Sequence, residues 1–313
     1  MRSLADERKE WLKILSGKDR HAIVRQLTQM TWDAAAFRVV NEARRLAPPD
    51  PDGGVQLNGL MHSLLDRAFF ASHMAAVRRL TDKYSLEGSR GVCSMSALLA
   101  DMLRNRELFT REAIFAAEGL EYDYEPMRQK CFEYARQREA AGERAYWVPP
   151  ELQWHKHENR HKQVDRLAGI RPQGRRPEDT VRECVFVNLQ QKVEGACQTV
   201  VEHVNKFIAH AATPESRATV GADEAGLTLN HLWQGHQHLC EVAGFVAGYV
   251  LGDACPGFLA IPQFDQFQYI ERPIIASSQV DRLQALWRDF EQECHDWSQW
   301  GIDEYEAEFG GTP

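Results

Sequence analysis

The sequence predicts an all-α protein, and three observations support that prediction. Apolar residues recur with helical spacing in almost every long segment, and no alternating strand pattern of useful length is present. The breaks, such as 48–54 and 169–177, are rich in proline and glycine, which cannot continue a helix. Helices are expected over residues 6–16, 19–47, 58–83, 94–107, 110–118, 126–141, 151–168, 178–212, 223–252 and 278–298.

Local signals predict where some of these helices begin and end. Ser94 is expected to be an N-cap, because its hydroxyl can accept a hydrogen bond from an amide of the first turn. Thr180 or Asp179 would cap the helix that begins near residue 178 in the same way. Pro214 is expected to end that helix, since the residue before a proline disfavours helical geometry.

The expected organisation is a single, mostly helical domain over residues 1–313, without internal repeats. A sub-boundary is expected near 142–150. Residues 253–276 form a long connection rich in proline and aromatic residues. We expect this connection to cover the helical body, with a partner site as the alternative. Residues 277–313 add a final helix and an acidic tail.

The composition excludes several functional classes. A chain of 313 residues with 43% apolar content can bury a full core. The net charge of −8 argues against generic nucleic-acid coating. None of the seven cysteines forms a C-x-x-C pair, so reduced, mostly buried thiols are expected. The N-terminus lacks a signal-peptide core, and the apolar run from Val242 to Leu251 is too short to span a bilayer. We therefore expect a cytoplasmic protein without membrane contact.

Charge is distributed unevenly along the chain. Residues 155–182 hold eight Lys or Arg against four Asp or Glu, whereas the residues from Asp289 onward hold eight acids and no Lys or Arg. This polarity could guide RNA or a neighbouring subunit, or it could be ordinary solvated surface. The candidates for RNA binding are Arg171, Arg175 and Arg176.

The run from His157 to His161 matches H-E-x-x-H, in which two histidines one helical turn apart bind zinc. Zinc-binding helices of this kind are mostly apolar, whereas WHKHENRHKQ is polar on every side. Arg160 would also place a cation beside the metal. A surface helix is therefore expected here, and no metal site.

Three further histidines, His231, His236 and His238, are expected to be partly buried and hydrogen-bonded rather than metal ligands. The sequence contains no G-x-S-x-G nucleophile signature and no glycine-rich phosphate loop. No cysteine has the local signature of a nucleophile. No cofactor is therefore expected.

The segment that leads to residue 212 carries two distinct faces. One is an apolar stripe with alternating spacings of three and four, and Val204 lies near its middle. His203, Lys206 and His210 cluster on another face. The stripe consists of Val193, Cys197, Val200, Val204, Ile208 and Ala211.

The run VNKFIAH, residues 204–210, resembles the signature helix of HEPN domains, a family of helical RNA-binding and RNA-cleaving domains. The segment LNGLMHSLLDRAFFASHMAAVRRLTD, followed by a loop and SMSALLADML, is similar to the AbiU-type abortive-infection proteins of that family. The likeness covers about residues 20–252. It implies an antiparallel HEPN-like bundle with additional helices, a homodimer and a role in phage defence or stress response.

In RNA-cleaving members, an arginine and a histidine promote attack of a ribose 2′-hydroxyl on its own phosphate without a metal. The resemblance assigns His210 as the catalytic histidine and Asn205 as the polar residue of the motif. Lys206 and His203 could add positive charge. Val204 stands where the motif has its arginine. An altered metal-independent ribonuclease, which needs no cofactor, and a non-catalytic scaffold or antitoxin-like protein therefore remain alternatives.

Arginines precede histidines at similar spacing elsewhere, as in Arg67 and His73 or Arg288 and His295. About as many such pairs are expected by chance. Only Arg288 is followed directly by a polar residue, Asp289, as the motif favours. In the non-catalytic alternative, Asn205 and His210 form hydrogen bonds across the bundle and end the helix.

Overall fold

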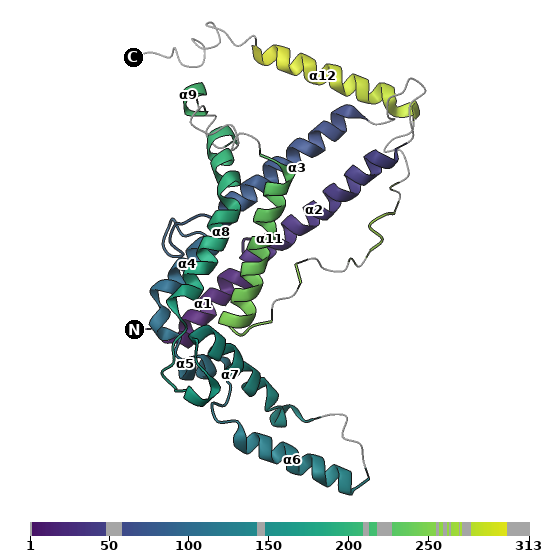
Figure 1. Cartoon of the computed structure of the whole chain (residues 1–313). Coiled ribbons are helices and arrows are strands. Elements are labelled where there is room, and N and C mark those ends of the chain that lie inside the picture. The colour runs from purple at the N-terminus through teal and green to yellow at the C-terminus, as the bar shows by residue number, and fades with distance from the viewer. Residues whose placement is uncertain are drawn as a thin grey trace, which may run out of the picture. The chain divides into compact units, whose positions relative to one another are not determined.

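In the computed structural model of the protein, the regular secondary structure of the described residues is helical (Figure 1). Apart from helices and turns, these residues contain one isolated β-bridge, between Thr110 and Thr180. The prediction of an all-α protein is therefore confirmed. The described residues are 2–47, 58–142, 148–208, 213–217, 227–254, 257–258, 262, 264–268, 270 and 277–298.

The helices follow the expected segments closely. The α-helices are α1 (Leu4–Ser16), α2 (Ile23–Leu46), α3 (Gly59–Leu80), α4 (Met95–Arg104), α5 (Arg111–Glu118), α6 (Glu125–Ala140), α7 (His155–Ala168), α8 (Glu183–His203), α9 (Pro214–Arg217), α11 (Leu229–Phe245) and α12 (Val280–Ser298). The 3₁₀ turns are η1 (Arg106–Leu108), η2 (Pro150–Leu152), η3 (Pro172–Gly174) and η6 (Ser277–Gln279). Two π-helical segments, η4 (Val204–Ile208) and η5 (Val246–Val250), continue α8 and α11.

Polar side chains cap several helices at their N-termini. The Ser94 hydroxyl accepts a hydrogen bond from the Ala97 amide at 3.0 Å, which confirms the predicted cap of α4. Asn58 and Thr110 cap α3 and α5 in the same way. Each cap satisfies an amide that has no partner within the helix, and losing such a cap typically costs about 1 kcal/mol.

The predicted cap of α8 is wrong. The helix begins at Glu183, several residues later than expected, and no side chain caps it. Asp179 and Thr180 are held instead by the start of α5. The Arg111 amide donates to the Asp179 carbonyl at 2.8 Å, and Thr180 forms the bridge with Thr110. Tertiary contacts thus keep this stretch extended despite its local preference for a cap.

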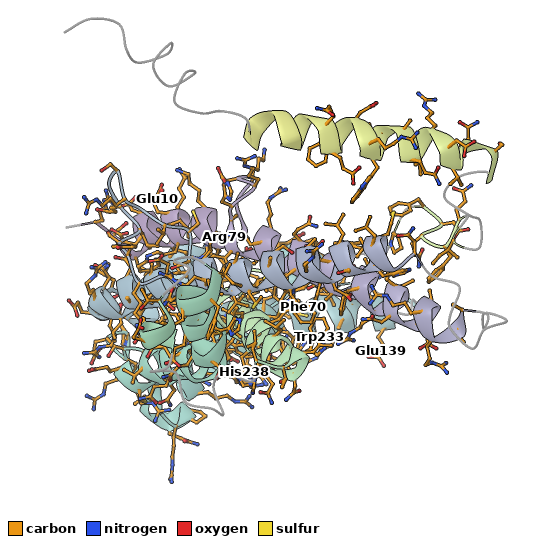
Figure 2. The ribbon with its side chains drawn as sticks, turned by 90° about the horizontal axis from the view of Figure 1, so that it is seen from above. Glu10, Phe70, Arg79, Glu139, Trp233 and His238 are labelled. Carbon is orange, nitrogen blue, oxygen red and sulfur yellow. The ribbon has the colours of Figure 1, made fainter. Side chains whose placement is uncertain are left out.

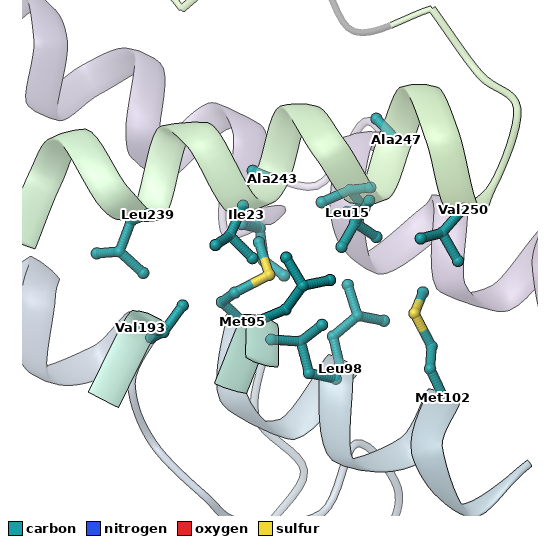
Figure 3. Close-up of a cluster of buried hydrophobic side chains, with 14 of the residues drawn as sticks. Leu15, Ile23, Met95, Leu98, Met102, Val193, Leu239, Ala243, Ala247 and Val250 are labelled. Atoms are coloured by element: carbon teal, nitrogen blue, oxygen red, sulfur yellow. The ribbon is translucent and has the colours of Figure 1, made fainter. Parts of the chain in front are cut away.

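The core lies between α8 and α11, which pack side by side along much of their length, with α4 against α8 and α2 against α3 (Figure 1). Side chains from α4, α8 and α11 meet in one apolar cluster (Figure 3). Met95, Leu98, Val193 and Leu239 in this cluster are all fully buried. Truncating such a leucine or methionine to alanine typically costs about 2–5 kcal/mol, because a cavity remains.

The apolar stripe of α8 is confirmed up to Val204, which is 4% exposed, but not beyond it. Ile208 was expected on the same buried face, yet it is 41% exposed. The reason is the change from α to π geometry over η4. A π turn contains more residues than an α turn, so side chains after Val204 fall out of phase with the stripe. Ala211 lies outside the described residues.

The chain divides into two compact units, residues 1–260 and 261–313. The expected sub-boundary near 142–150 lies inside the first unit. Much of the 253–276 connection and the acidic tail after residue 298 lie outside the described residues. Among the described helices, none combines the length and the apolar content that crossing a bilayer requires.

Candidate functional site

His203 closes α8 immediately before the π-helical segment η4. Its ring stacks on that of Phe207, with centroids 4.6 Å apart, and its Nδ1 is buried without a hydrogen-bond partner. Burial lowers the pKa of His203, because the charged form loses hydration. Burial therefore favours the neutral form of this histidine. π turns inside α-helices are rare and occur frequently at functional sites.

An arginine from another helix lies beside Asn205. The Arg78 Nε, on α3, donates to the Asn205 Oδ1 at 3.1 Å. A terminal nitrogen of the same guanidinium donates to Asp82 at 3.1 Å. A guanidinium from α3 therefore contacts the residue next to Val204. Sequence reasoning missed it, because Arg78 lies 127 positions before Asn205.

The other motif residues contact different elements. Lys206 extends toward α9, where its Nζ donates to the Ser216 hydroxyl at 2.9 Å. Asn205 contacts α3, so these two polar side chains do not form one cluster. His210, the expected catalytic histidine, lies outside the described residues.

The three arginines expected to bind RNA follow α7. Arg171 and Arg176 are exposed, whereas Arg175 is partly buried and pairs with Asp165 at 2.6 Å. Burial opposes ionisation of Asp165, but hydrogen bonds from Arg175 and Arg111 outweigh it and lower the pKa of that carboxyl. Arg175 therefore already has a strong internal partner, while Arg171 and Arg176 remain accessible.

The prediction of a surface helix at the H-E-x-x-H run is wrong. His157, Arg160 and His161 are only 8%, 3% and 3% exposed. They are buried because neighbouring elements supply polar partners. Arg160 pairs with Glu118 on α5 and also donates to the carbonyls of Tyr249 and Val250.

Both nitrogens of His161 are used within the protein. Nε2 lies 2.9 Å from the Tyr122 carbonyl, and Nδ1 lies 3.1 Å from the Arg111 guanidinium. Nδ1 of His157 lies 3.1 Å from the Glu121 carbonyl. Neither arrangement leaves a pair of imidazoles aimed at a common metal. Across the described residues, no group of three or more His, Cys, Asp or Glu side chains could hold a metal ion.

The histidines of α11 have mainly structural contacts, as expected. His231 forms a capping box with Thr228 at the start of the helix. His236 is 8% exposed, and its Nε2 lies 3.1 Å from the Thr31 hydroxyl. His238 is partly buried. The prediction of hydrogen-bonded, partly buried histidines is confirmed for His231 and His236.

A second candidate site is a cavity of about 550 Å³ between α2 and α3, which we call the α2–α3 cavity. Its size falls within the range of small-molecule sites. Its lining is unusually cationic for a chain with a net charge of −8. The lining residues are Arg20, His21, Arg25, Gln26, Thr28, Gln29, Met30, Asp33, Ser72, His73, Ala76 and Arg79.

His73 forms part of the wall of this cavity and is 2% exposed. Neither ring nitrogen has a hydrogen-bond partner in the protein. Its neighbours are the rings of Phe69, Trp233 and His236, at centroid distances of 5.2, 5.6 and 5.0 Å. Burial, with a smaller contribution from His236, lowers the pKa of His73 to about 3.

The sequence contained little that would identify this cavity. His73 entered the sequence analysis only as part of a chance spacing with Arg67, and Arg67 itself is exposed and bonded to the Ser63 carbonyl. Arg79, labelled in Figure 2, begins the Arg-Leu-x-Asp end of the segment that resembles the AbiU-type proteins, but that resemblance does not indicate a cavity. The cavity residues come from two helices and the turn before α2, so their proximity depends on how α2 packs against α3.

Comparison with known proteins gives no further assignment. No protein-family model matches the chain, and neither a curated protein nor a solved structure matches it.

Proposed function

We propose that this protein is a HEPN/AbiU-like protein of bacterial defence or stress response that acts on RNA in the cytoplasm. The observation that carries the proposal is the Arg78 guanidinium, 3.1 Å from Asn205 in the segment that resembles the HEPN signature. An antiparallel HEPN-like bundle and a homodimer belong to the same proposal.

The proposed chemistry is metal-independent cleavage of RNA. A base removes the proton from a ribose 2′-hydroxyl, whose oxygen attacks the adjacent phosphate. The bond to the 5′-oxygen breaks, and an acid returns a proton to that oxygen, which leaves a 2′,3′-cyclic phosphate. His210 would serve as acid or base, and Arg78 would offset charge on the phosphate.

Arg78 is bound to Asp82, so it would have to exchange that carboxylate for an RNA phosphate. The pair is partly exposed, and exposed pairs are weak enough to exchange. A guanidinium also suits phosphate better than Lys206, because its planar donors can bind two oxygens at once.

The test is incubation of the protein with tRNA, mRNA and single-stranded oligonucleotides in EDTA. We expect cleavage that leaves 2′,3′-cyclic ends and is lost in His210→Ala and strongly reduced in Arg78→Gln. Arg79→Gln is the matched control, since it removes the same charge from the next residue of α3. All variants are first shown to be folded by thermal melting.

Cleavage by the Arg78→Gln variant at the wild-type rate would contradict the assigned role of this arginine. Absence of cleavage by well-folded wild-type protein would contradict ribonuclease activity as a whole. Cleavage that disappears in EDTA and returns with a divalent metal would contradict the metal-independent chemistry.

The second candidate function is a non-catalytic scaffold or antitoxin-like protein with a protein partner. The supporting observation is an exposed apolar stripe on α12. Leu283, Leu286, Trp287 and Phe290 recur at helical spacing, and each is at least 50% exposed. Exposed apolar faces of this kind frequently bind another chain.

The scaffold function is tested by light scattering coupled to size-exclusion chromatography. We expect Leu286→Glu to reduce self-association or partner binding, whereas Gln284→Glu, which adds the same charge on the same helix, should not. Equal behaviour of both variants and the wild type would contradict a role of the α12 stripe.

A further inference from the structure

The α2–α3 cavity continues into a second hollow along the same two helices. The second hollow has a volume of about 330 Å³ and shares Asp33 and Ser72 with the first. We call the two together the α2–α3 groove. Its two ends differ in chemistry: one is lined by arginines and the other mainly by apolar side chains.

The polar end presents guanidinium groups. No side-chain hydrogen bond or ion pair joins Arg79 to another described residue. The Arg25 Nε donates to the Gly17 carbonyl at 3.0 Å, and the Arg20 Nε donates to the His21 Nε2 at 3.0 Å. The terminal nitrogens of both guanidinium groups have no hydrogen bond to another described residue. These forks can bind the oxygens of a phosphate in pairs.

The floor of this end contains unsatisfied polar atoms. His73 is 2% exposed, and neither of its nitrogens has a partner in the protein. The Gln26 amide nitrogen donates to the carbonyls of His21 and Cys93, which fixes the orientation of the amide. Its Oε1 is buried without a partner. Leaving such groups unpaired is destabilising, so their retention points to a ligand that completes them.

The far end of the groove is apolar. Phe37 and Phe69 stack with centroids 3.9 Å apart and form part of its wall. Val40 and Leu65 extend this surface along α2 and α3. Asp33, one of the two side chains that line both ends, accepts a hydrogen bond from Gln29 at 2.8 Å.

The spacing along α2 places Asp33 away from the arginines at the polar end of the groove. Arg25 and Asp33 are eight residues apart, which is about 12 Å along a helix. Asp33 therefore faces the middle of the groove rather than an anionic group bound by Arg25. A carboxylate in that position can accept a hydrogen bond from a ligand hydroxyl that lies between the anionic group of the ligand and its apolar part.

We propose that the α2–α3 groove binds an organic phosphate, with the phosphate held by Arg20, Arg25 and Arg79 and an apolar body against Phe37 and Phe69. A phosphate monoester fits better than a sulfate or carboxylate. Near neutral pH it retains part of a proton, which can be donated to the Gln26 Oε1. This site does not depend on the proposed ribonuclease.

The experiment is calorimetric titration of the full chain with 1-naphthyl phosphate, inorganic phosphate, 1-naphthyl sulfate and 1-naphthol. We expect 1-naphthyl phosphate to bind most tightly, because it alone matches both ends of the groove and the Gln26 acceptor. Arg79→Gln is expected to weaken its binding by about tenfold or more, since a charge-assisted hydrogen bond is lost. Arg67→Gln, which removes the same charge from an exposed position of α3 outside the groove, should leave binding unchanged.

The His73→Leu variant separates binding from folding. It removes unpaired nitrogens from the floor, so it should raise the thermal midpoint while weakening binding of 1-naphthyl phosphate several-fold. Failure of 1-naphthyl phosphate to bind would overturn the proposal, as would equal weakening by Arg67→Gln and Arg79→Gln. Binding of 1-naphthol as tight as that of its phosphate would also overturn it. RNA cleavage should be unaffected by Arg79→Gln, so the two proposals fail independently.

Discussion

Arg78 and Arg79 show how far the placement of a single residue determines its chemistry. They are adjacent on α3, yet one contacts Asn205 and the other lines the α2–α3 cavity. Successive residues of a helix differ by about 100° in direction, so neighbours in sequence face different elements. The same substitution at these two positions therefore tests two separate sites.

His73 should make the stability of the protein depend on pH. Its pKa is about 3 in the folded state, against about 6.5 when unfolded. Above pH 6.5 the residue is neutral in both states, and stability is unaffected. Below pH 6.5 only the unfolded chain takes up the proton, so the free energy of unfolding falls as the pH drops toward 3. Uptake of one proton by the unfolded chain lowers the free energy of unfolding by about 1.4 kcal/mol for each pH unit.

The measurement is urea unfolding of wild type and His73→Leu at pH 7, 6 and 5. The variant should be more stable at pH 7 by about 1–3 kcal/mol, because unpaired buried polar atoms are removed. Its stability should also fall less steeply with pH. His236 has a lowered pKa for the same reason and remains in both proteins, so only the difference between them reports His73. Parallel pH profiles would contradict this interpretation.

At the scale of elements, buried ion pairs join α5 to α7 and to the stretch that precedes α8. Arg111 is fully buried and pairs with Asp165 at 2.8 Å and Asp179 at 3.0 Å. Arg175 reaches the same Asp165. This network adds to the apolar packing of Val164 and Leu167 of α7, and it explains how polar residues of the same helix can also be buried.

Removal of Arg111 should strongly destabilise this junction. Arg111→Met removes the ion pair of Asp179 and leaves Asp165 with Arg175 alone, and breaking a buried pair in this way typically costs about 3–5 kcal/mol. Arg45→Met removes one partner of an exposed pair with Glu42 and should have little effect. Denaturant unfolding of both variants provides the comparison. Similar stabilities would show that the buried network contributes no more than surface charge.

The turn after η5, the segment that continues α11, depends on a glycine. Gly252 has a φ of +60°, and a Cβ there would collide with the Glu118 carboxylate that binds Arg160. Gly252→Ala should therefore destabilise the fold by more than about 2 kcal/mol, since backbone strain is added to the disturbed ion pair. Gly119→Ala is the matched control: its φ is +65°, but its Cβ would meet open space. Gly119→Ala should lose only the stability that backbone strain costs, about 1–2 kcal/mol. Equal losses in thermal or urea unfolding would argue against the collision.

At the scale of the whole molecule, the large apolar cluster lies entirely within the first unit. Its members run from Leu4 to Leu251, and Phe258 packs against them. Residues 261–313 form the second unit. The first unit therefore holds the core that stabilises both candidate sites.

Deletion of residues 261–313 should leave the first unit folded. We expect the free energy of unfolding to change by less than about 1 kcal/mol, because no member of the apolar cluster is removed. Urea unfolding followed by circular dichroism measures this change. Loss of a cooperative transition would contradict the assignment of two units. If the α12 stripe mediates self-association, the shortened chain should also become monomeric.

The sequence by itself determined the helical class and the approximate position of nearly every helix. These depend on apolar periodicity, on caps such as Ser94, and on proline or glycine at the breaks, all of which act over a few residues. The buried stripe of α8 as far as Val204 was predictable for the same reason. Whether His210 is catalytic stays a prediction.

Only the tertiary structure decided the features that depend on distant partners. The π turn of η4 exposed Ile208, and packing against α5 kept Asp179 from capping α8. Burial of Arg160 required Glu118, and the place of Arg78 beside Asn205 required α3 to pack against η4. Local preferences set the helices, but the burial of a polar side chain depends on partners that folding brings from elsewhere in the chain.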